Sequence, residues 1–325
     1  MNIYEDESIQ CRVLVVGASP DTLNNNTHIR SYVTNGFKSC LGTDSAKQVS
    51  LEYAENVISS WMPNLVVIFG SCMPDRSVYL GINRLCKSQG IPIAFWLHDD
   101  PYEFDYSYKA EHVADWIFSN DRWASMHYSH DNVFHLPLGA CEVAHYRAWT
   151  PQKKYQIFFC GVAFPNRVQL VSDLSKIMSR YATFICGREW PILGSFISNQ
   201  SVDNQELPSL VASSTITLNI GRSFNLANER FQLDPSTPGP RTFEAAMAGT
   251  VQLYFSDSLE IEDYFVIDQE ILLFDSPSSF ELQVERLLDQ PDLVAKIALA
   301  AQKRALAEHT YKNRCTRLLQ CCGLI

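Results

Sequence analysis

Residues 236–249 place a turn, a cation and a carboxylate at the start of a predicted helix. The stretch Pro238–Pro240 predicts a rigid turn, because proline suits the first position of a helix. Arg241 then falls in the first helical turn, where the helix dipole disfavours a cation unless an anion is close. Glu244 follows on the same helix face, with Thr242 between them. An arginine for a diphosphate and a glutamate for two ribose hydroxyls predict a nucleotide-sugar site; an Arg–Glu surface pair is the alternative.

Further cations follow predicted strands. Gly161 comes directly after the apolar run QIFFC, where a glycine lets a phosphate approach the start of the next helix. Arg167 lies in that helix and can fork onto phosphate oxygens, unless this is a plain turn with a surface arginine. Arg188 and Arg222 follow two more such runs, and Trp190 either stacks on a base or packs in the core. The spacing is not GxGxxG, so a dinucleotide fingerprint is absent.

The segment LHDDPYEFD concentrates ionisable groups after another predicted strand. His98, Asp99 and Asp100 are candidates for a general base that activates a hydroxyl group, or for a structural clamp. Adjacent side chains diverge in an extended segment, which argues against a shared metal ion. An Asp–Pro turn with solvated acids is the alternative. The loops Gly17–Ser19 and Gly70–Ser71 also follow predicted strands and could line the acceptor side of the site, but the pattern that predicts this is weaker.

Short apolar runs alternate with amphipathic segments along the whole chain. Strands are predicted at 12–16, 65–69, 91–96, 116–118 and 133–136, and, after a polar stretch near 150, at 156–160, 182–186, 215–219, 251–255 and 271–274. Helices are predicted at 51–61, 78–89, 167–180, 240–248 and 280–288, and in a long stretch from Pro291. This alternation predicts an α/β fold with two doubly wound parallel sheets, whose ligands bind at the carboxyl ends of the strands.

Composition limits the function. The chain has 325 residues, which at about 150 residues per domain predicts two domains. Its net charge of −10 argues against a nucleic-acid partner. No apolar stretch is long enough for a membrane span, and the acidic stretch Met1–Gln10 lacks a signal-peptide pattern, so a cytoplasmic location is expected. Ten scattered cysteines, without CxxC pairs, are expected to be reduced and mostly buried.

The combined order of several motifs resembles the CgeB-like, spore-maturation-type family, which belongs with glycosyltransferases of the GT-B fold. The motifs are FWLHDDPYEFD, ADWIFSND, HLPLGA, FFCGVAFPNRVQL, TLNIGR, PSTPGPRTFEAAMAGTVQL and EHTYKNR. The resemblance implies two facing Rossmann-like domains, at 1–150 on the acceptor side and 151–305 on the donor side. It also implies that a C-terminal helix at 306–325 crosses back onto the first domain. By similarity, Arg241 and Glu244 fall on the phosphate and ribose positions, and Asp99 replaces a glutamate of the acidic motif.

The resemblance predicts a metal-independent glycosyltransferase that moves a sugar from a nucleotide diphosphate to a hydroxyl acceptor, with no further cofactor. Retaining relatives carry two glutamates seven residues apart; Glu244 matches the second, but Thr237 stands at the first, so the stereochemistry stays open. The alternatives are a sugar-nucleotide epimerase of the same fold and a non-catalytic nucleotide-sugar-binding protein. A DNA-modifying transferase would need a basic acceptor face, yet residues 1–150 carry ten basic and 17 acidic side chains.

Overall fold

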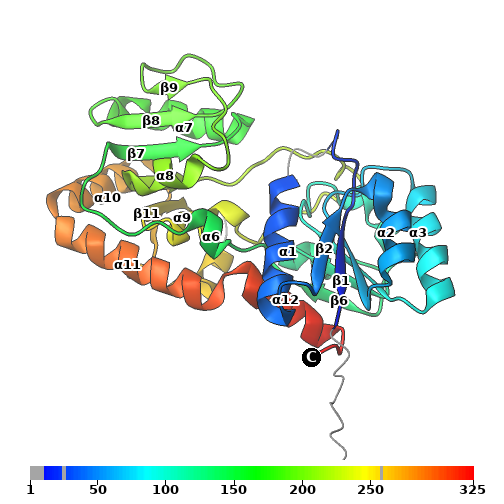
Figure 1. Cartoon of the computed structure of the whole chain (residues 1–325). Coiled ribbons are helices and arrows are strands. Elements are labelled where there is room, and N and C mark those ends of the chain that lie inside the picture. Colours follow the sequence, from blue (N-terminus) through cyan, green and yellow to red (C-terminus); the bar gives the residue numbers. More distant parts are fainter. Residues whose placement is uncertain (1–10, 24–26, 257–258) are drawn as a thin grey trace, which may run out of the picture. The chain divides into compact units, whose positions relative to one another are not determined.

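The computed structural model describes residues 11–23, 27–256 and 259–325. The acidic stretch Met1–Gln10 therefore lies outside the described residues. The chain divides into two compact units, each of which holds one parallel six-stranded sheet flanked by helices (Figure 1). Unit 1 consists of the chain up to Leu138, Asn225–Pro235 and Tyr311–Ile325, and unit 2 consists of Gly139–Phe224 and Ser236–Thr310.

These divisions differ from the sequence analysis, which places them after residues 150 and 305. The polar stretch near residue 150 lies within unit 2 and leads directly into its first strand. The excursion of Asn225–Pro235 into unit 1 is not among the predictions from the sequence.

The sheet of unit 1 has the strand order β2-β1-β3-β4-β5-β6. Its three central strands are buried at every residue, as continuous apolar runs in a parallel sheet should be. Helices α1 and α12 lie on one side of the sheet and α2 and α3 on the other (Figure 1). The strands are β1 (Val13–Gly17), β2 (Ala46–Val49), β3 (Leu65–Phe69), β4 (Ile93–Leu97), β5 (Trp116–Ser119) and β6 (Val133–His135). The helices are α1 (Thr27–Leu41), η1 (Leu51–Tyr53), α2 (Ala54–Trp61), α3 (Arg76–Gln89), η2 (Phe104–Tyr106), α4 (Tyr108–Glu111), α5 (Arg122–Ser125) and α12 (Tyr311–Cys321).

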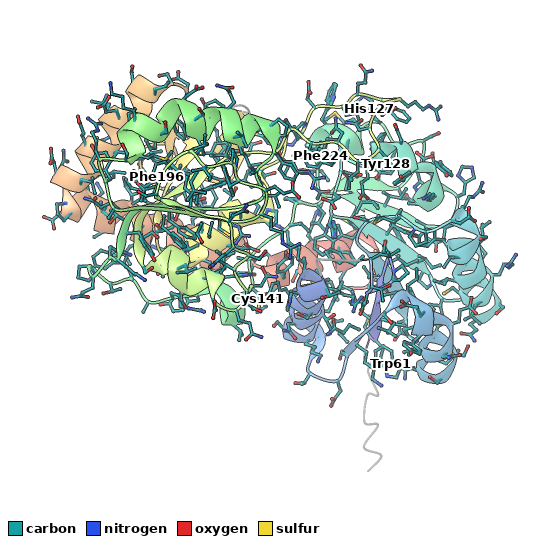
Figure 2. All side chains as sticks on the ribbon, turned by 90° about the horizontal axis from the view of Figure 1, so that it is seen from above. Trp61, His127, Tyr128, Cys141, Phe196 and Phe224 are labelled. Atoms are coloured by element: carbon teal, nitrogen blue, oxygen red, sulfur yellow. The ribbon has the colours of Figure 1, made fainter. Side chains whose placement is uncertain are left out.

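Trp61, labelled in Figure 2, ends α2 beside the polar edge strand β2. The Lys47 ammonium lies 4.8 Å from the centre of its ring, and the Arg12 guanidinium lies 5.7 Å from it. The contact of Lys47 joins strand β2, which exposes two of its four side chains, to the helix layer, and that of Arg12 joins the residue before β1 to it.

The C-terminal helix α12 packs closely against α1, which confirms the predicted return of the chain to the first unit. A Cβ atom on Gly36 of α1 would lie 2.7 Å from the Tyr311 carbonyl oxygen and 2.8 Å from the Cys315 sulfur. Only glycine at position 36 therefore permits this contact without displacement. Arg314 also donates a hydrogen bond to the Leu138 carbonyl oxygen, at 3.2 Å.

The excursion at 225–235 is held within unit 1 by the segment after the acidic motif. The Tyr102 carbonyl accepts hydrogen bonds from the amides of Leu226 and Ala227, each at 2.9 Å. The Asp105 carboxylate accepts from the amides of Glu229 and Arg230, at 2.9 and 3.2 Å. Asp105 thus has a structural role.

The sheet of unit 2 has the order β12-β11-β10-β7-β8-β9, the 3-2-1-4-5-6 order of dinucleotide-binding folds when its strands are numbered along the chain. Its strand order reverses between β7 and β10, where such sheets bind ligands. The strands are β7 (Tyr155–Cys160), β8 (Thr183–Cys186), β9 (Ile197–Ser198), β10 (Ser214–Asn219), β11 (Val251–Phe255) and β12 (Leu272–Phe274). The helices are α6 (Glu142–His145), α7 (Pro165–Met178), α8 (Leu207–Ala212), α9 (Pro240–Met247), η3 (Leu259–Asp263), α10 (Pro277–Asp289) and α11 (Pro291–Glu308).

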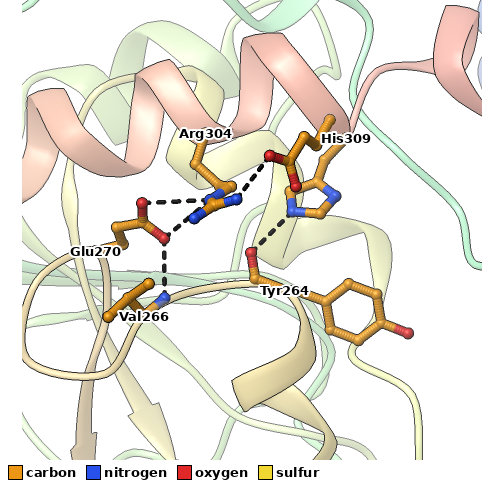
Figure 3. Close-up of polar contacts among 6 residues, drawn as sticks. Tyr264, Val266, Glu270, Arg304 and His309 are labelled. Carbon is orange, nitrogen blue, oxygen red and sulfur yellow. Dashed lines mark hydrogen bonds and ion pairs between the residues drawn. The ribbon is translucent and has the colours of Figure 1, made fainter.

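A polar network fixes the end of α11 within unit 2 (Figure 3). Arg304 bridges Glu270, at 3.2 Å, and Glu308, at 2.6 Å. Glu270 also accepts the Val266 amide, at 2.8 Å. The buried His309 ring contacts the Tyr264 carbonyl oxygen at 2.9 Å, so the last turn of α11 is tied to the loop before β12.

Candidate functional site

The loops after β7 and β8 meet at the carboxyl edge of the sheet of unit 2. The Gly161 amide donates to the Cys186 carbonyl oxygen at 3.0 Å, and the Gly161 carbonyl accepts the Trp190 indole N–H at 2.9 Å. A Cβ atom on Gly187, whose φ is +141°, would lie 1.9 Å from the Gly161 carbonyl oxygen. Trp190 is 5% exposed, so the structure favours packing over the alternative of base stacking.

Arg167 holds the loops after β7 and β10 together. Its guanidinium donates to the carbonyl oxygens of Val162 at 3.1 Å, Gly221 at 3.0 Å and Ile220 at 3.0 and 3.2 Å. It also lies 5.0 Å from the centre of the Phe164 ring. Each guanidinium nitrogen has a carbonyl partner, so this geometry supports a structural clamp at the point where the strand order reverses. Direct binding of a phosphate by Arg167 stays a prediction.

The other two loop arginines lie at the same edge. Arg188 donates from Nε to the Ser201 hydroxyl at 2.6 Å, while its carbonyl accepts the Ala163 amide at 3.0 Å. The Arg222 guanidinium lies 5.8 Å from the centre of the Phe164 ring. The structure therefore places both arginines around the loop that contains Gly161.

Arg241 and Glu244 form the predicted pair at the start of α9. Arg241 Nη1 lies 3.2 Å from Glu244 Oε2, and the side chains are 36% and 13% exposed, respectively. The residue before the helix, Gly239, has no side chain to cap its first N–H groups. A partly exposed guanidinium beside a helix start that lacks a side-chain cap is a suitable arrangement for an anion.

His145 completes this cluster, although it is not among the site residues predicted from the sequence. Its Nδ1 accepts the amide N–H of Cys141, the residue labelled at the start of α6 in Figure 2, at 2.9 Å. The neutral ring therefore carries its proton on Nε2, which lies 3.6 Å from Glu244 Oε1. Burial lowers the pKa of His145, and the nearby Arg241 and Arg147 lower it further against the opposing effect of Glu244. A neutral His145 thus presents an N–H toward the glutamate.

Thr242, a predicted donor-binding residue, is completely buried. Its hydroxyl accepts a hydrogen bond from Asn219 Nδ2 at 2.7 Å, and its carbonyl accepts from Gln252 Nε2 at 2.9 Å. Asn219 also donates to Gln252 Oε1 at 3.0 Å. These bonds join α9 to β10 and β11, so the position of Thr242 supports a structural role.

Thr237 stands where the resemblance would place a first glutamate, and a carboxylate from elsewhere in the chain lies beside it. The Thr237 hydroxyl contacts the two oxygens of Glu260 at 2.9 and 3.1 Å. The Tyr264 hydroxyl donates to the same carboxylate at 2.6 Å. These bonds anchor the loop before α9 to η3.

In unit 1, Asp99 and Asp100 diverge toward different strands, as the sequence analysis expects of adjacent residues. The Asp100 side chain turns toward β5, where it accepts from the hydroxyls of Ser119 at 2.6 Å and Tyr128 at 2.7 Å (Tyr128 is labelled in Figure 2). Asp100 is 5% exposed, and burial raises its pKa to about 6 despite these two donors. Of the two predicted roles, general base and structural clamp, the position of Asp100 therefore supports the structural clamp.

Asp99 turns toward β3 instead. It accepts from the Ser71 hydroxyl at 3.0 Å, and its Oδ2 lies 3.4 Å from His98 Nδ1. The His98 side chain is 3% exposed and meets the Phe69 ring edge-on, whereas the Asp99 side chain is 20% exposed. Asp99 is thus the best placed of the three candidates to meet a substrate.

Glu103 is a further member of this cluster that the sequence analysis did not include among its candidates. It is 6% exposed, and burial, followed by the charge of Asp99, raises its pKa to about 7. Glu103 lines a small cavity together with Asp99, Asp100 and Tyr128. The sequence feature that could have pointed to Glu103 is its position three residues after Asp100, next to an aromatic residue.

No group of three or more His, Cys, Asp or Glu side chains is arranged to hold a metal ion in the part of the chain that the structure describes. Likewise, none of the described helices is long and apolar enough to cross a membrane.

Comparison with known sequences gives two partial matches. Residues 167–320, slightly less than half of the chain, match the family described as Glycosyl transferase-like. Over 108 residues the chain is 26% identical to the spore protein CgeB of Bacillus subtilis (strain 168), an alignment that covers 32% of this chain and 33% of that protein. The match thus spans about a third of the length of this curated relative.

Comparison with solved structures shows the fold. HepE from Anabaena, solved in complex with UDP and glucose, has a TM-score of 0.63 at 7% identity and covers 97% of this chain and 100% of its own. Sucrose-phosphate synthase from Thermosynechococcus elongatus has a TM-score of 0.64 at 9% identity, with coverages of 95% and 98%. A glycosyltransferase from Rickettsia africae has a TM-score of 0.64 at 11% identity, with coverages of 95% and 97%. These likenesses confirm the predicted GT-B class of α/β fold, and the matched family supports the prediction of an enzyme.

Proposed function

We propose that the chain is a glycosyltransferase that moves a sugar from a nucleotide-diphosphate donor to a hydroxyl acceptor. The observation that carries this proposal is the Arg241–Glu244 pair at the start of α9. This helix belongs to unit 2, whose sheet has the strand order of nucleotide-binding folds. The GT-B fold, the Glycosyl transferase-like match and the UDP complexes of HepE support it. The weak CgeB match agrees with a CgeB-like member of this group.

The proposed donor site divides the work among the residues of unit 2. Arg241 neutralises the charge that develops on the departing diphosphate. Glu244 accepts hydrogen bonds from the ribose hydroxyls, and the N–H of neutral His145 orients its carboxylate. Gly161 permits close packing of the loop, because a Cβ atom there would lie 2.9 Å from the Arg167 guanidinium and 3.1 Å from the Phe159 ring. Arg188 and Arg222 add positive charge at the same edge. Arg167 and Thr242 fix the loops and the helix that carry these groups.

Unit 1 supplies the proposed acceptor base. The proposed role of Asp99, beside His98, is to remove the proton of the acceptor hydroxyl. Asp100 holds the loop in place through Ser119 and Tyr128. A base of this kind is required if the reaction inverts the sugar's configuration. The proposed reaction needs no metal ion, so full activity in EDTA is expected; strict metal dependence would contradict it.

Isothermal titration calorimetry with UDP and UDP-glucose tests the donor site. Arg241→Ala and Glu244→Gln should each weaken binding, Arg241→Ala by at least about tenfold, because hydrogen bonds to charged groups contribute about 1.5–3 kcal/mol. Arg180→Ala is the matched control, since Arg180 is an exposed arginine that pairs with Glu281. Unchanged affinity of Arg241→Ala would contradict the assignment.

Product analysis distinguishes the alternatives. A transferase releases UDP only when an acceptor or water takes the sugar. An epimerase converts the donor with no acceptor present, and a binding protein leaves it unchanged. A cytoplasmic location stays an expectation, which fractionation of cells would test.

A further inference from the structure

Two cysteines end neighbouring strands at the edge that carries the proposed donor site. Cys160 is the last residue of β7 and Cys186 the last of β8, and the two are register partners. Neighbouring strands lie about 4.8 Å apart, within the Cα separation that a disulfide spans. Both side chains contact one apolar cluster, which includes Leu207 and Ala245. The two sulfur atoms are therefore on the same face of the sheet.

The two thiols differ in accessibility. Cys160 is partly exposed, whereas Cys186 is completely buried. The single S–H of Cys186 has two acceptors, the Phe159 carbonyl oxygen at 3.8 Å and the sulfur of Cys160. A partly exposed cysteine with a buried cysteine beside it has the arrangement of an attacking cysteine and a resolving cysteine.

The charges around Cys160 favour its thiolate. The hydrogen bond from Cys186 and the guanidinium groups of Arg241 and Arg167 lower the pKa of Cys160, against burial and the charge of Glu244. Burial and the shared hydrogen bond raise the pKa of Cys186. The other cysteines with a shifted pKa are all shifted upward, chiefly by burial: Cys11, Cys72, Cys86, Cys141, Cys315, Cys321 and Cys322. Cys160 is therefore the best nucleophile among the shifted thiols.

We propose that Cys160 is an oxidation site for hydroperoxides, with Cys186 as its resolving partner, so that peroxide links the ends of β7 and β8 by a disulfide. In the first step, the Cys160 thiolate attacks an oxygen of the hydroperoxide. The O–O bond breaks, the alcohol or water leaves with a proton from solvent, and Cys160 becomes a sulfenic acid. In the second step, the Cys186 sulfur attacks the Cys160 sulfur. The S–O bond breaks, and the hydroxyl group leaves as water with the proton of Cys186.

This oxidation also bears on the proposed donor site, a consequence that rests on the proposed function. The Cys160 thiolate and a donor diphosphate would compete for the positive charge of Arg241. Bound UDP should therefore slow the reaction of Cys160, and the disulfide should alter the loop at Gly161 that the donor approaches.

Thiol labelling of the full-length protein without donor tests the oxidation site. At about pH 7, iodoacetamide should alkylate Cys160 at least about fivefold faster than Cys11, because a larger share of Cys160 is thiolate. Arg241→Gln should slow this alkylation. After treatment with hydrogen peroxide, digestion without reductant should yield a Cys160–Cys186 cross-linked peptide. Cys186→Ser should instead leave a sulfenic acid on Cys160 that dimedone traps, and Cys160→Ser should give neither product.

Alkylation of Cys160 no faster than that of Cys11, or no cross-link and no dimedone adduct, would overturn the proposal. Addition of UDP separates it from the proposed function. A cross-link that forms equally fast with saturating UDP would keep the oxidation site and contradict the placement of the diphosphate at Arg241.

Discussion

Replacement of Arg167 by methionine tests whether this arginine is a clamp or a ligand-binding residue. Methionine keeps most of the aliphatic length but removes the donors to the carbonyl oxygens of Val162, Ile220 and Gly221. At about 1 kcal/mol for each acceptor left without its donor, unit 2 should lose about 3 kcal/mol of unfolding free energy. A domain of this size loses about 2–4 °C per kcal/mol, so its melting temperature should fall by roughly 6–12 °C.

Differential scanning calorimetry measures this change, and titration with UDP at a temperature where the variant is folded measures binding. Arg180→Met is the control, because its exposed ion pair should contribute less than about 1 kcal/mol. The melting temperature of Arg167→Lys should lie between those of Arg167→Met and the wild type, since an ammonium cannot reach all three carbonyls in their fixed directions. An Arg167→Met variant that melts like the wild type but no longer binds UDP would refute the clamp.

Three further substitutions probe other buried groups. Burial raises the pKa of Glu103 from 4.5 to about 7, so the native state keeps a proton that the unfolded chain releases, and stability falls as the pH rises through that window. In urea unfolding, the free energy of unfolding of Glu103→Gln should therefore rise by about 2 kcal/mol relative to that of the wild type between about pH 5.5 and 7.5. A difference between the two proteins that does not change with pH would contradict a buried neutral carboxyl. Thr242→Val leaves Asn219 without its hydroxyl acceptor and should cost about 1–3 kcal/mol in the same assay, while UDP affinity of the folded variant persists. Gly187→Ala should cost more than about 2 kcal/mol, because its Cβ would meet the Gly161 carbonyl, whereas Gly90→Ala, with nothing within 4 Å of the added atom, should cost about 1 kcal/mol.

The strands were the most predictable part of the fold. β3 and β11 have the bounds that the sequence predicts, because both are short, mainly apolar runs in a parallel sheet; β3 is apolar throughout, and Gln252 is the one polar residue of β11. Edge strand β2 was not predicted, since two of its four side chains are exposed and polar. Helix α1 was also missed; its sequence, THIRSYVTNGFKSCL, mixes β-branched residues, serine and glycine, which are weak helix formers.

The candidate site was predictable where its residues are neighbours in the sequence. Arg241 and Glu244 could be paired because helix geometry brings residues three apart together. The role of Arg167 could not be read in the same way, because two of its acceptors lie more than 50 residues away on another loop. His145 reaches Glu244 from a helix nearly 100 residues earlier, and no local pattern links the two. Sequence spacing thus predicted chemistry within one element, whereas contacts between elements required the structure.

The chain passes between its two units after Leu138, Phe224, Pro235 and Thr310, and this connectivity fixes the order in which the units can be finished. A ribosome makes the chain from its N-terminus, and domains that are contiguous in sequence generally fold in that order. In this chain the two units are completed in the opposite order. Unit 2 is fully synthesised at Thr310, whereas unit 1 still lacks α12, the helix that covers Gly36 of α1. The unit that begins first is therefore completed last, and until then the α12-facing side of α1 is an exposed surface that a nascent chain must keep from aggregating.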